Sequence, residues 1–246
     1  MCIRDRDTKF GFSTIKRDDK TKKVGEVFSS VSENYDLMNN LMSLGLHKVW
    51  KKIVIQTASL QANAKILDIA AGTADLTLAF TQQNKNFEIF QTDINFAMLL
   101  EGQKILINHG KIIPAIACDG EALPFPNNYF DCVTIAFGLR NMTNKDTALQ
   151  EVYRVLSPGG KVIILEFSQV NKRLAKLYDL FSFKIIPKLG GIFAKDESSY
   201  QYLVESIRVH PDQEKLKELM EAQLFENVSY INLSAGIVSI HKGYKI

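Results

Sequence analysis

The chain has 246 residues, of which 46% are hydrophobic, 10% aromatic and 23% charged. This composition provides a buried core and argues against wholesale disorder. No apolar run approaches the roughly 18 residues that a membrane-spanning helix needs, and residues 1–23 lack the apolar core of a signal peptide, so we expect a cytoplasmic protein. The three cysteines, Cys2, Cys118 and Cys132, are not spaced as metal ligands, which predicts reduced thiols and no metal site.

The net charge of +3 is concentrated at the N-terminal end. Residues 1–23 hold eight Lys or Arg and four Asp, a surplus of +4, so the remaining chain carries about −1. We expect 1–23 to be a basic, mobile tail that either touches anionic lipid or nucleic acid or is simply solvated. The isoelectric point of about 8.6 does not favour a nucleic-acid surface over the whole domain.

The middle of the chain alternates strand-like and helix-like segments. Short apolar runs predict strands at Lys65–Ala70, Phe87–Thr92, Ile112–Cys118, Phe130–Phe137 and Lys161–Phe167. Helical spacing predicts helices at Asp75–Gln83, at Asn95–Asn108, and from Asn144 to the breaker Ser157–Gly160. Strands separated by helix-length segments indicate an α/β fold with a parallel sheet and helices on both faces.

The last third of the chain changes character. Ser168–His210 is longer than one crossover helix and is either an extra packed layer or a lid over a pocket. Pro211–Leu224 is an amphipathic helix whose predicted inward residues are Leu216, Leu219, Met220 and Leu224. Asn227–Leu233 and Ile237–Tyr244 are separated by three residues, so these strands form an antiparallel hairpin. We expect one domain over 24–246, Rossmann-like, with a mostly parallel seven-stranded sheet, an antiparallel last strand and a helical substrate-side insertion at about 168–210.

Asp93 follows the second predicted strand, where open parallel sheets bind their ligands. A carboxylate there can accept hydrogen bonds from both hydroxyls of a ribose, with a helix-capping aspartate as the alternative. The turn after the first strand holds only one glycine, Gly72, and carries Asp75, whereas a pyrophosphate site needs several glycines and repels acids. The pattern favours S-adenosylmethionine, a cation without phosphate, and leaves a nicotinamide-dependent reductase as an alternative.

Polar residues at the other strand ends extend this predicted site. Asp68 either orients the Gly72 turn or faces the methionine ammonium. Asp119 and Gly120 follow the third strand and can bind adenine, although Asp-Gly is also an ordinary turn. Arg140 and Asn141 follow the fourth strand and are expected to face the substrate, with a surface salt bridge as the alternative for Arg140.

Several motifs resemble the ubiquinone/menaquinone biosynthesis C-methyltransferases, a family that includes demethylmenaquinone methyltransferases and methoxy-polyprenyl-benzoquinol methylases. The resemblance covers about Phe10 to Ile246. The two most specific signatures are Phe28–Val31 with Tyr35–Ser43, His47 and Trp50, and Arg154–Gly160 leading to Leu165–Ser168. Further matches are Glu121–Pro126, Phe137–Asn141, His210–Gln213 and His241–Tyr244.

The resemblance implies S-adenosylmethionine-dependent C-methylation of a polyprenylated quinol. The family's cofactor contacts map onto Thr73, Asp93 and Asp119–Gly120. The chain departs from the family pattern at four places: Ala74 where Gly is usual, Asp119–Gly120 where Asn-Ala is frequent, Ala136 where Ser often contributes a contact, and Ser157 where Lys is usual. Ala136 can offer only backbone groups to the cofactor, and Ala74 weakens binding if its backbone needs a positive φ.

Methylation of a quinol carbon requires a ring oxygen that has lost its proton. We expect Arg140 to stabilise that anion and a base to remove the proton, with His47 as first and His210 as second candidate. Tyr35, Asp36 and Asn141 are candidate partners of the substrate. The expected partners are the quinol and, through the basic tail and the Lys172–Lys188 segment, the inner face of an anionic membrane. A homo-oligomer, a quinone-biosynthesis complex, another acceptor and a catalytically silent subunit stay open.

Overall fold

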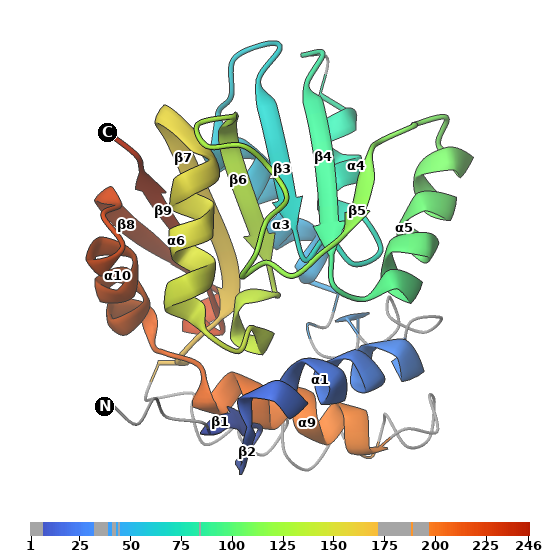
Figure 1. Ribbon diagram of the computed structural model, residues 1–246, viewed down its shortest axis with the longest axis vertical. Coiled ribbons are helices and arrows are strands. Elements are labelled where there is room, and N and C mark those ends of the chain that lie inside the picture. The colour runs from blue at the N-terminus through green and yellow to red at the C-terminus, as the bar shows by residue number, and fades with distance from the viewer. Residues whose placement is uncertain are drawn as a thin grey trace.

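The computed structural model describes residues 7–31, 39–40, 43, 45–83, 85–171, 188 and 197–246. A central sheet carries helices on both faces, and α1 and α9 lie across the carboxyl ends of its strands (Figure 1). The strands are β1 (Asp7–Phe10), β2 (Ser13–Lys16), β3 (Lys65–Ile69), β4 (Glu88–Asp93), β5 (Ala115–Ala117), β6 (Phe130–Ala136), β7 (Leu156–Phe167), β8 (Glu226–Leu233) and β9 (Val238–Tyr244). The helices are α1 (Arg17–Val31), α3 (His47–Ala58), α4 (Asp75–Thr81), α5 (Phe96–Asn108), α6 (Lys145–Val155), α9 (Glu197–Val209) and α10 (Gln213–Ala222).

The large sheet has seven strands in the order β5-β4-β3-β6-β7-β9-β8. β3 to β7 pair in parallel, whereas β9 is antiparallel to both β7 and β8. The predicted mostly parallel sheet with a reversed last strand is therefore confirmed. Strand order changes direction between β3 and β6, and this is the place where a parallel sheet offers a ligand site.

Side chains of the buried strands alternate between two hydrophobic cores. In β3, Ile66 joins a core with α3, α4 and α9, and Leu67 joins a core with α6 and α10. In β7, Ile163 and Leu165 face the first core, whereas Val162 and Ile164 face the second. Burial on both sides explains why these strands are continuous apolar runs in the sequence.

Three element ends differ from the sequence-based expectation. β5 has only three residues, and Ile112, expected to begin it, is 91% exposed. α6 ends at Val155, before the predicted breaker Ser157–Gly160, but β7 begins at Leu156 and not at Lys161, with an irregular register opposite β6. α10 ends at Ala222, so Leu224, predicted to point inward, lies beyond the helix and is exposed.

Residues 7–23, expected to form a mobile tail, have regular secondary structure. They form the β1–β2 hairpin and the first half of α1. The ring of Phe10 stacks on Tyr202 of α9 with centroids 4.2 Å apart, and the buried Lys20 donates to the carbonyl of Met142 at 3.0 Å. The segment thus packs on the core of the domain.

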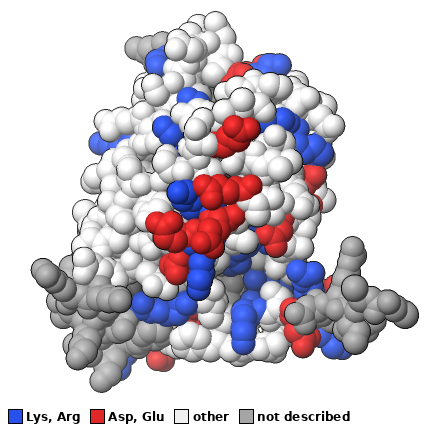
Figure 2. Space-filling model, turned by 90° about the vertical axis from the view of Figure 1, so that its left-hand side faces the viewer, with Lys and Arg blue, Asp and Glu red and all other residues white. Residues whose placement is uncertain are grey.

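The predicted insertion at 168–210 contains α9, which packs on the hairpin and on α1, while 172–187 and 189–196 lie outside the described residues. Within the described ranges no helix is both long and apolar enough to cross a bilayer. Figure 2 shows acidic side chains gathered on the face formed by β8 and α10. The acids of α10 and its N-cap are Asp212, Glu214, Glu218 and Glu221.

Candidate active site

A cavity lies between α1 and the carboxyl ends of β3, β4, β5 and β6. The strand ends contribute four residues that the sequence predicted for cofactor binding, namely Gly72, Asp93, Asp119 and Gly120. Asn141, predicted to face the substrate, also lines it. The lining residues from α1 were not predicted, because the pattern of 1–23 gave no sign that this helix packs over the strand ends. They are Thr21, Val24, Gly25 and Phe28.

Asp93 connects the two strand ends that form the cavity floor. Its Oδ2 accepts from the Gly72 amide at 2.9 Å, and its Oδ1 accepts from the Asn95 amide at 2.8 Å. Burial raises the pKa of this carboxyl to about 6, although the backbone hydrogen bonds act in the opposite direction. Carboxylate oxygens accept more than one hydrogen bond, so Asp93 can hold the turn and still accept from a ligand hydroxyl.

The Gly72 turn lies close to α5. A Cβ added at Gly102 of α5 would lie 2.8 Å from the carbonyl oxygen of Gly72 and 3.1 Å from the Cβ of Ala74. Ala74 has a φ of 65° and is fully buried, so it adopts the left-handed conformation in which glycine is usual. Its methyl group packs on Gly102 and is not part of the cavity wall.

Three other predicted cofactor residues lie behind the wall. Asp68 accepts from Thr77 and from Thr134, both at 2.8 Å, and burial raises its pKa to about 6. It therefore ties β3 to α4 and β6, which agrees with the alternative that Asp68 orients the turn. Thr73 is buried and its hydroxyl has no partner among the described residues. Ala136 ends β6 without reaching the cavity.

The turn after β5 is held in shape by its own carboxylates. Asp119 Oδ1 accepts from the Glu121 amide at 2.9 Å, and Glu121 Oε1 accepts from the Asn144 amide at 2.7 Å. A Cβ at Gly120 would lie 3.0 Å from the methyl carbon of Met142. Gly120 therefore lets the β6 connection approach the β5 turn closely.

Arg140 points into the protein. Its Nη1 donates to Glu166 Oε1 at 2.9 Å and to the Phe137 carbonyl, and its backbone amide donates to Glu166 Oε2 at 3.1 Å. Both side chains of the pair are buried. The guanidinium is part of a buried ion pair, so the structure places it neither on the cavity wall nor in the surface salt bridge considered as the alternative.

The adjacent Asn141 reaches the cavity because the Arg140–Glu166 pair holds the short helix Leu139–Asn141. Its Oδ1 accepts from the Tyr202 hydroxyl at 3.0 Å. Sequence reasoning missed Tyr202 and Glu166, since both contacts join residues far apart in the chain. The Leu165–Ser168 motif was the only signal that pointed to Glu166.

Neither candidate base lies on the cavity wall. His47 Nε2 is 3.0 Å from Asn40 Oδ1, and burial lowers its pKa to about 4. His210 is buried, neither ring nitrogen has a partner among the described residues, and burial lowers its pKa well below the usual value. Both imidazoles are therefore neutral at pH 7. Tyr35 and Asp36 lie outside the described residues.

The two described cysteines are free, as expected. Cys118 directly follows β5 and Cys132 lies in β6, and β4 and β3 lie between these two strands in the sheet. Cys118 lines the cavity, and burial raises its pKa to about 11. Cys132 is fully buried, and burial raises its pKa to about 12.

The chemistry of the wall fits a cationic ligand. Three carboxylates line the cavity, Asp93, Asp119 and Glu121, and none of the described residues of the wall is Lys or Arg. A pyrophosphate would meet this acidic wall without a basic partner, whereas the sulfonium and ammonium of S-adenosylmethionine complement it.

The fold is that of known methyltransferases. A SAM-dependent methyltransferase from Aquifex aeolicus superposes with a TM-score of 0.62 at 12% identity, covering 86% of this chain and 98% of that chain. A putative S-adenosyl-L-methionine-dependent methyltransferase from Methanococcus maripaludis gives 0.59 at 19% identity, covering 85% and 90%. The chain therefore has the fold of the S-adenosylmethionine-dependent methyltransferases.

Sequence comparison narrows this class. The profile of the ubiE/COQ5 methyltransferase family matches residues 16–245. The ubiquinone/menaquinone biosynthesis C-methyltransferase UbiE of Nitrosospira multiformis is 53% identical over 241 residues, 98% of this chain and 99% of the relative. Its namesake from Neisseria meningitidis serogroup A is 55% identical over 239 residues, 97% and 98%. The chain belongs to the ubiE/COQ5 methyltransferase family, as the motif resemblance predicted.

Proposed function

We propose that this enzyme transfers the methyl group of S-adenosylmethionine to a ring carbon of a polyprenylated quinol in ubiquinone or menaquinone biosynthesis. The names of the relatives at 53% and 55% identity support the acceptor class. The observation that carries the proposal is Asp93, a buried carboxylate at the β4 end that holds the Gly72 turn and lines an acidic cavity.

The cofactor assignment follows from the order of groups along the wall. Asp93 accepts from the ribose hydroxyls, and the Asp119–Gly120 turn lies at the neighbouring strand end, where it binds the adenine. Gly72 lies in the turn that follows β3, where its backbone groups meet the methionine part. When bound there, S-adenosylmethionine supplies an electrophilic methyl group beside a wall that carries negative charge.

On the acceptor side, the chain orients the ring and supports its anion. Asn141 is fixed by Tyr202 and by the Arg140–Glu166 pair, so its amide nitrogen is positioned to donate to a ring oxygen. Arg140 does not contact the acceptor; its buried ion pair with Glu166 fixes the short helix Leu139–Asn141 that carries Asn141. Correct placement of two reactants contributes about 7–11 kcal/mol to lowering a barrier. The two candidate bases, His47 and His210, are neutral, but neither lies on the described wall of the cavity.

The polyprenyl tail of such an acceptor is insoluble in water, so the enzyme collects it at a membrane surface. Basic side chains attract anionic lipid at about 1 kcal/mol each near the surface. Lys9, Lys16, Lys22 and Lys23 of the hairpin and α1 remain for this role, whereas Lys20 is buried. The acidic face of α10 is repelled by such a surface (Figure 2).

Turnover of a short-chain demethylmenaquinol tests the function. We expect a product heavier by one methyl group, formed only with S-adenosylmethionine, and loss of turnover in Asp93→Ala. Tight binding of NADH in place of S-adenosylhomocysteine in calorimetry would indicate a reductase. Cofactor binding without turnover of a demethylmenaquinol or a methoxy-polyprenyl-benzoquinol would indicate another acceptor or a silent subunit. Sedimentation with anionic liposomes at low salt tests the membrane contact, and a protein that stays in the supernatant contradicts it.

A further inference from the structure

The connection between β5 and β6 begins in the cavity and ends against α6. Its first residues, Asp119 to Glu121, line the cavity. The following stretch, residues 122–128, has no strand or helix of its own, so its backbone groups need partners from elsewhere. We call residues 122–128 the connecting loop. The position of the Asp119–Gly120 turn depends on what holds this loop.

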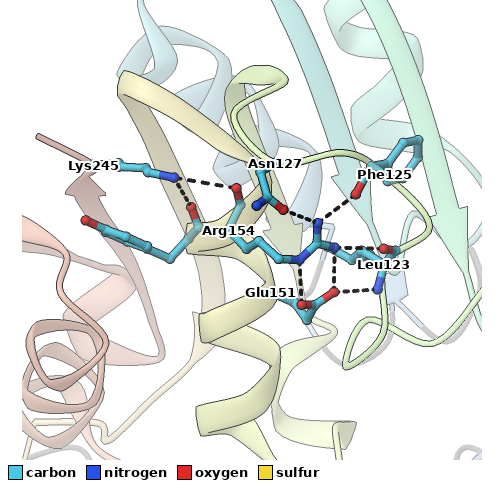
Figure 3. Close-up of polar contacts among 7 residues, drawn as sticks. Leu123, Phe125, Asn127, Glu151, Arg154 and Lys245 are labelled. Atoms are coloured by element: carbon cyan, nitrogen blue, oxygen red, sulfur yellow. Dashed lines mark hydrogen bonds and ion pairs between the residues drawn. The ribbon is translucent and has the colours of Figure 1, made fainter.

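Arg154, in the last turn of α6, supplies those partners (Figure 3). Its Nη2 donates to the Leu123 carbonyl at 2.8 Å, and its Nη1 donates to the Phe125 carbonyl at 2.7 Å and to Asn127 Oδ1 at 2.9 Å. Three points along the connecting loop thus meet one guanidinium. A planar fork of five N–H groups can satisfy acceptors that far apart, which a lysine ammonium cannot.

Glu151 holds the guanidinium in place from one turn earlier in α6. Its two carboxylate oxygens accept from Arg154 Nε at 2.7 Å and Nη2 at 2.8 Å, and this hydrogen bonding lowers the pKa of the carboxyl. The Leu123 amide also donates to Glu151 at 2.8 Å. The ion pair and the loop backbone therefore form one network, and a two-point pair of this kind restricts orientation as well as distance.

The same helix holds the loop at both ends. At its start, the Asn144 amide donates to Glu121 of the cavity wall at 2.7 Å. At the end of the loop, the Asn128 amide donates to the Arg154 carbonyl at 3.0 Å. Lys245, which follows β9, donates to Asn128 Oδ1 at 2.7 Å and also to the Tyr153 carbonyl of α6 at 2.8 Å (the second bond is drawn in Figure 3). A shift of the connecting loop against α6 would therefore be transmitted to Glu121 and to the turn beside it.

We propose that Arg154 is a positioning residue of the cofactor site: it fixes the connecting loop on α6 so that Asp119 and Gly120 stand at the cavity wall. The inference rests on the proposed function, which assigns this cavity to S-adenosylmethionine. Arg154 itself is not part of the wall. Its effect must therefore appear in cofactor affinity and not in the methyl-transfer step.

Two substitutions of Arg154 test this role. In Arg154→Gln we expect the Kd for S-adenosylhomocysteine and the KM for S-adenosylmethionine to rise about tenfold, since small displacements of binding groups have large effects. In Arg154→Lys, which keeps the charge and loses the fork, we expect a smaller rise. At saturating cofactor, kcat stays within about twofold of the wild type, because the acceptor side is untouched.

The matched control is Val228→Ala, a buried apolar truncation in β8 at the opposite edge of the sheet. It lowers the melting temperature without touching the connecting loop, so its Kd should equal that of the wild type. If Arg154→Gln does not fold, Asn127→Ala removes one of the three loop contacts and should still raise the Kd.

Arg154 variants that lose thermal stability but keep the wild-type Kd and KM overturn the positioning role and leave the proposed function intact. A fall in kcat with unchanged KM overturns it as well. A wild-type protein that does not bind S-adenosylhomocysteine overturns the proposed function, and the positioning role falls with it.

Discussion

Asp93 makes cofactor affinity dependent on pH near neutrality. With a pKa of about 6, the carboxyl is about nine-tenths ionised at pH 7 and about one-tenth ionised at pH 5. Only the carboxylate can accept from Gly72, Asn95 and two ribose hydroxyls together. The Kd for S-adenosylhomocysteine should therefore rise about tenfold between pH 7 and pH 5.

Asp93→Asn removes the charge and one acceptor while keeping the shape. Hydrogen bonds to a charged group contribute about 1 kcal/mol more than neutral ones, so losing two or three of them weakens binding by about 2–3 kcal/mol, roughly 30- to 150-fold. The variant should also lose the pH dependence of its Kd. Isothermal titration calorimetry from pH 5 to pH 8 measures both effects.

Unfolding does not account for weaker binding at pH 5. The folded-state pKa of Asp93 lies above the usual 3.8, so the folded protein binds the proton more tightly, and this group favours folding more at pH 5 than at pH 7. Asp68→Asn is the control, because Asp68 has a similar pKa but lies behind the wall. A wild-type Kd that is equal at pH 5 and pH 7, or a slope that survives in Asp93→Asn, would refute the reasoning.

Three further predictions concern stability. Burial raises the folded-state pKa of Asp68 to about 6, so Asp68 makes the free energy of unfolding fall by about 3 kcal/mol as pH rises from about 4 to about 6. In urea titrations, Asp68→Asn should not show this pH-dependent fall. Glu166→Gln leaves the buried Arg140 without its counter-ion and should lower the free energy of unfolding by about 3–5 kcal/mol; a variant as stable as the wild type in urea would contradict the buried pair. Gly138 and Ala70 both line the cavity, and the Cβ added by Gly138→Ala would lie 2.5 Å from the Cβ of Ala70. This clash should lower the free energy of unfolding by about 1–3 kcal/mol and weaken the binding of S-adenosylhomocysteine. Unchanged binding in calorimetry would show that the two strand ends can separate freely.

The sheet could be predicted because its strands are buried on both faces. Lys65–Ile69 and Phe130–Ala136 are apolar runs bounded by turn residues, and a buried parallel strand has this pattern. The same reasoning placed Asp93 at a strand end near Gly72, since the carboxyl ends of parallel strands meet at one edge. The structure confirms this geometry through the hydrogen bond between the two residues.

Contacts between residues that are far apart in the chain could not be predicted from the sequence. The sequence places Arg140 at a strand end, but the direction of its side chain depends on Glu166, 26 residues away. The basic pattern of 1–23 is typical of a solvated tail, yet Phe10 packs on Tyr202 and Lys20 bonds to Met142. Local patterns carry no information on such partners, so the α1 side of the cavity wall could not be predicted.

The burial of Cys118 affects how readily its thiol reacts with an electrophile in the cavity. An oxidised quinone with an unsubstituted ring carbon adds thiolates at that carbon, the same position that receives the methyl group in the quinol. With a pKa of about 11, only about three in ten thousand Cys118 side chains are thiolates at pH 7.5. The cavity therefore keeps a cysteine on its wall in the protonated form, which is much less nucleophilic than the thiolate.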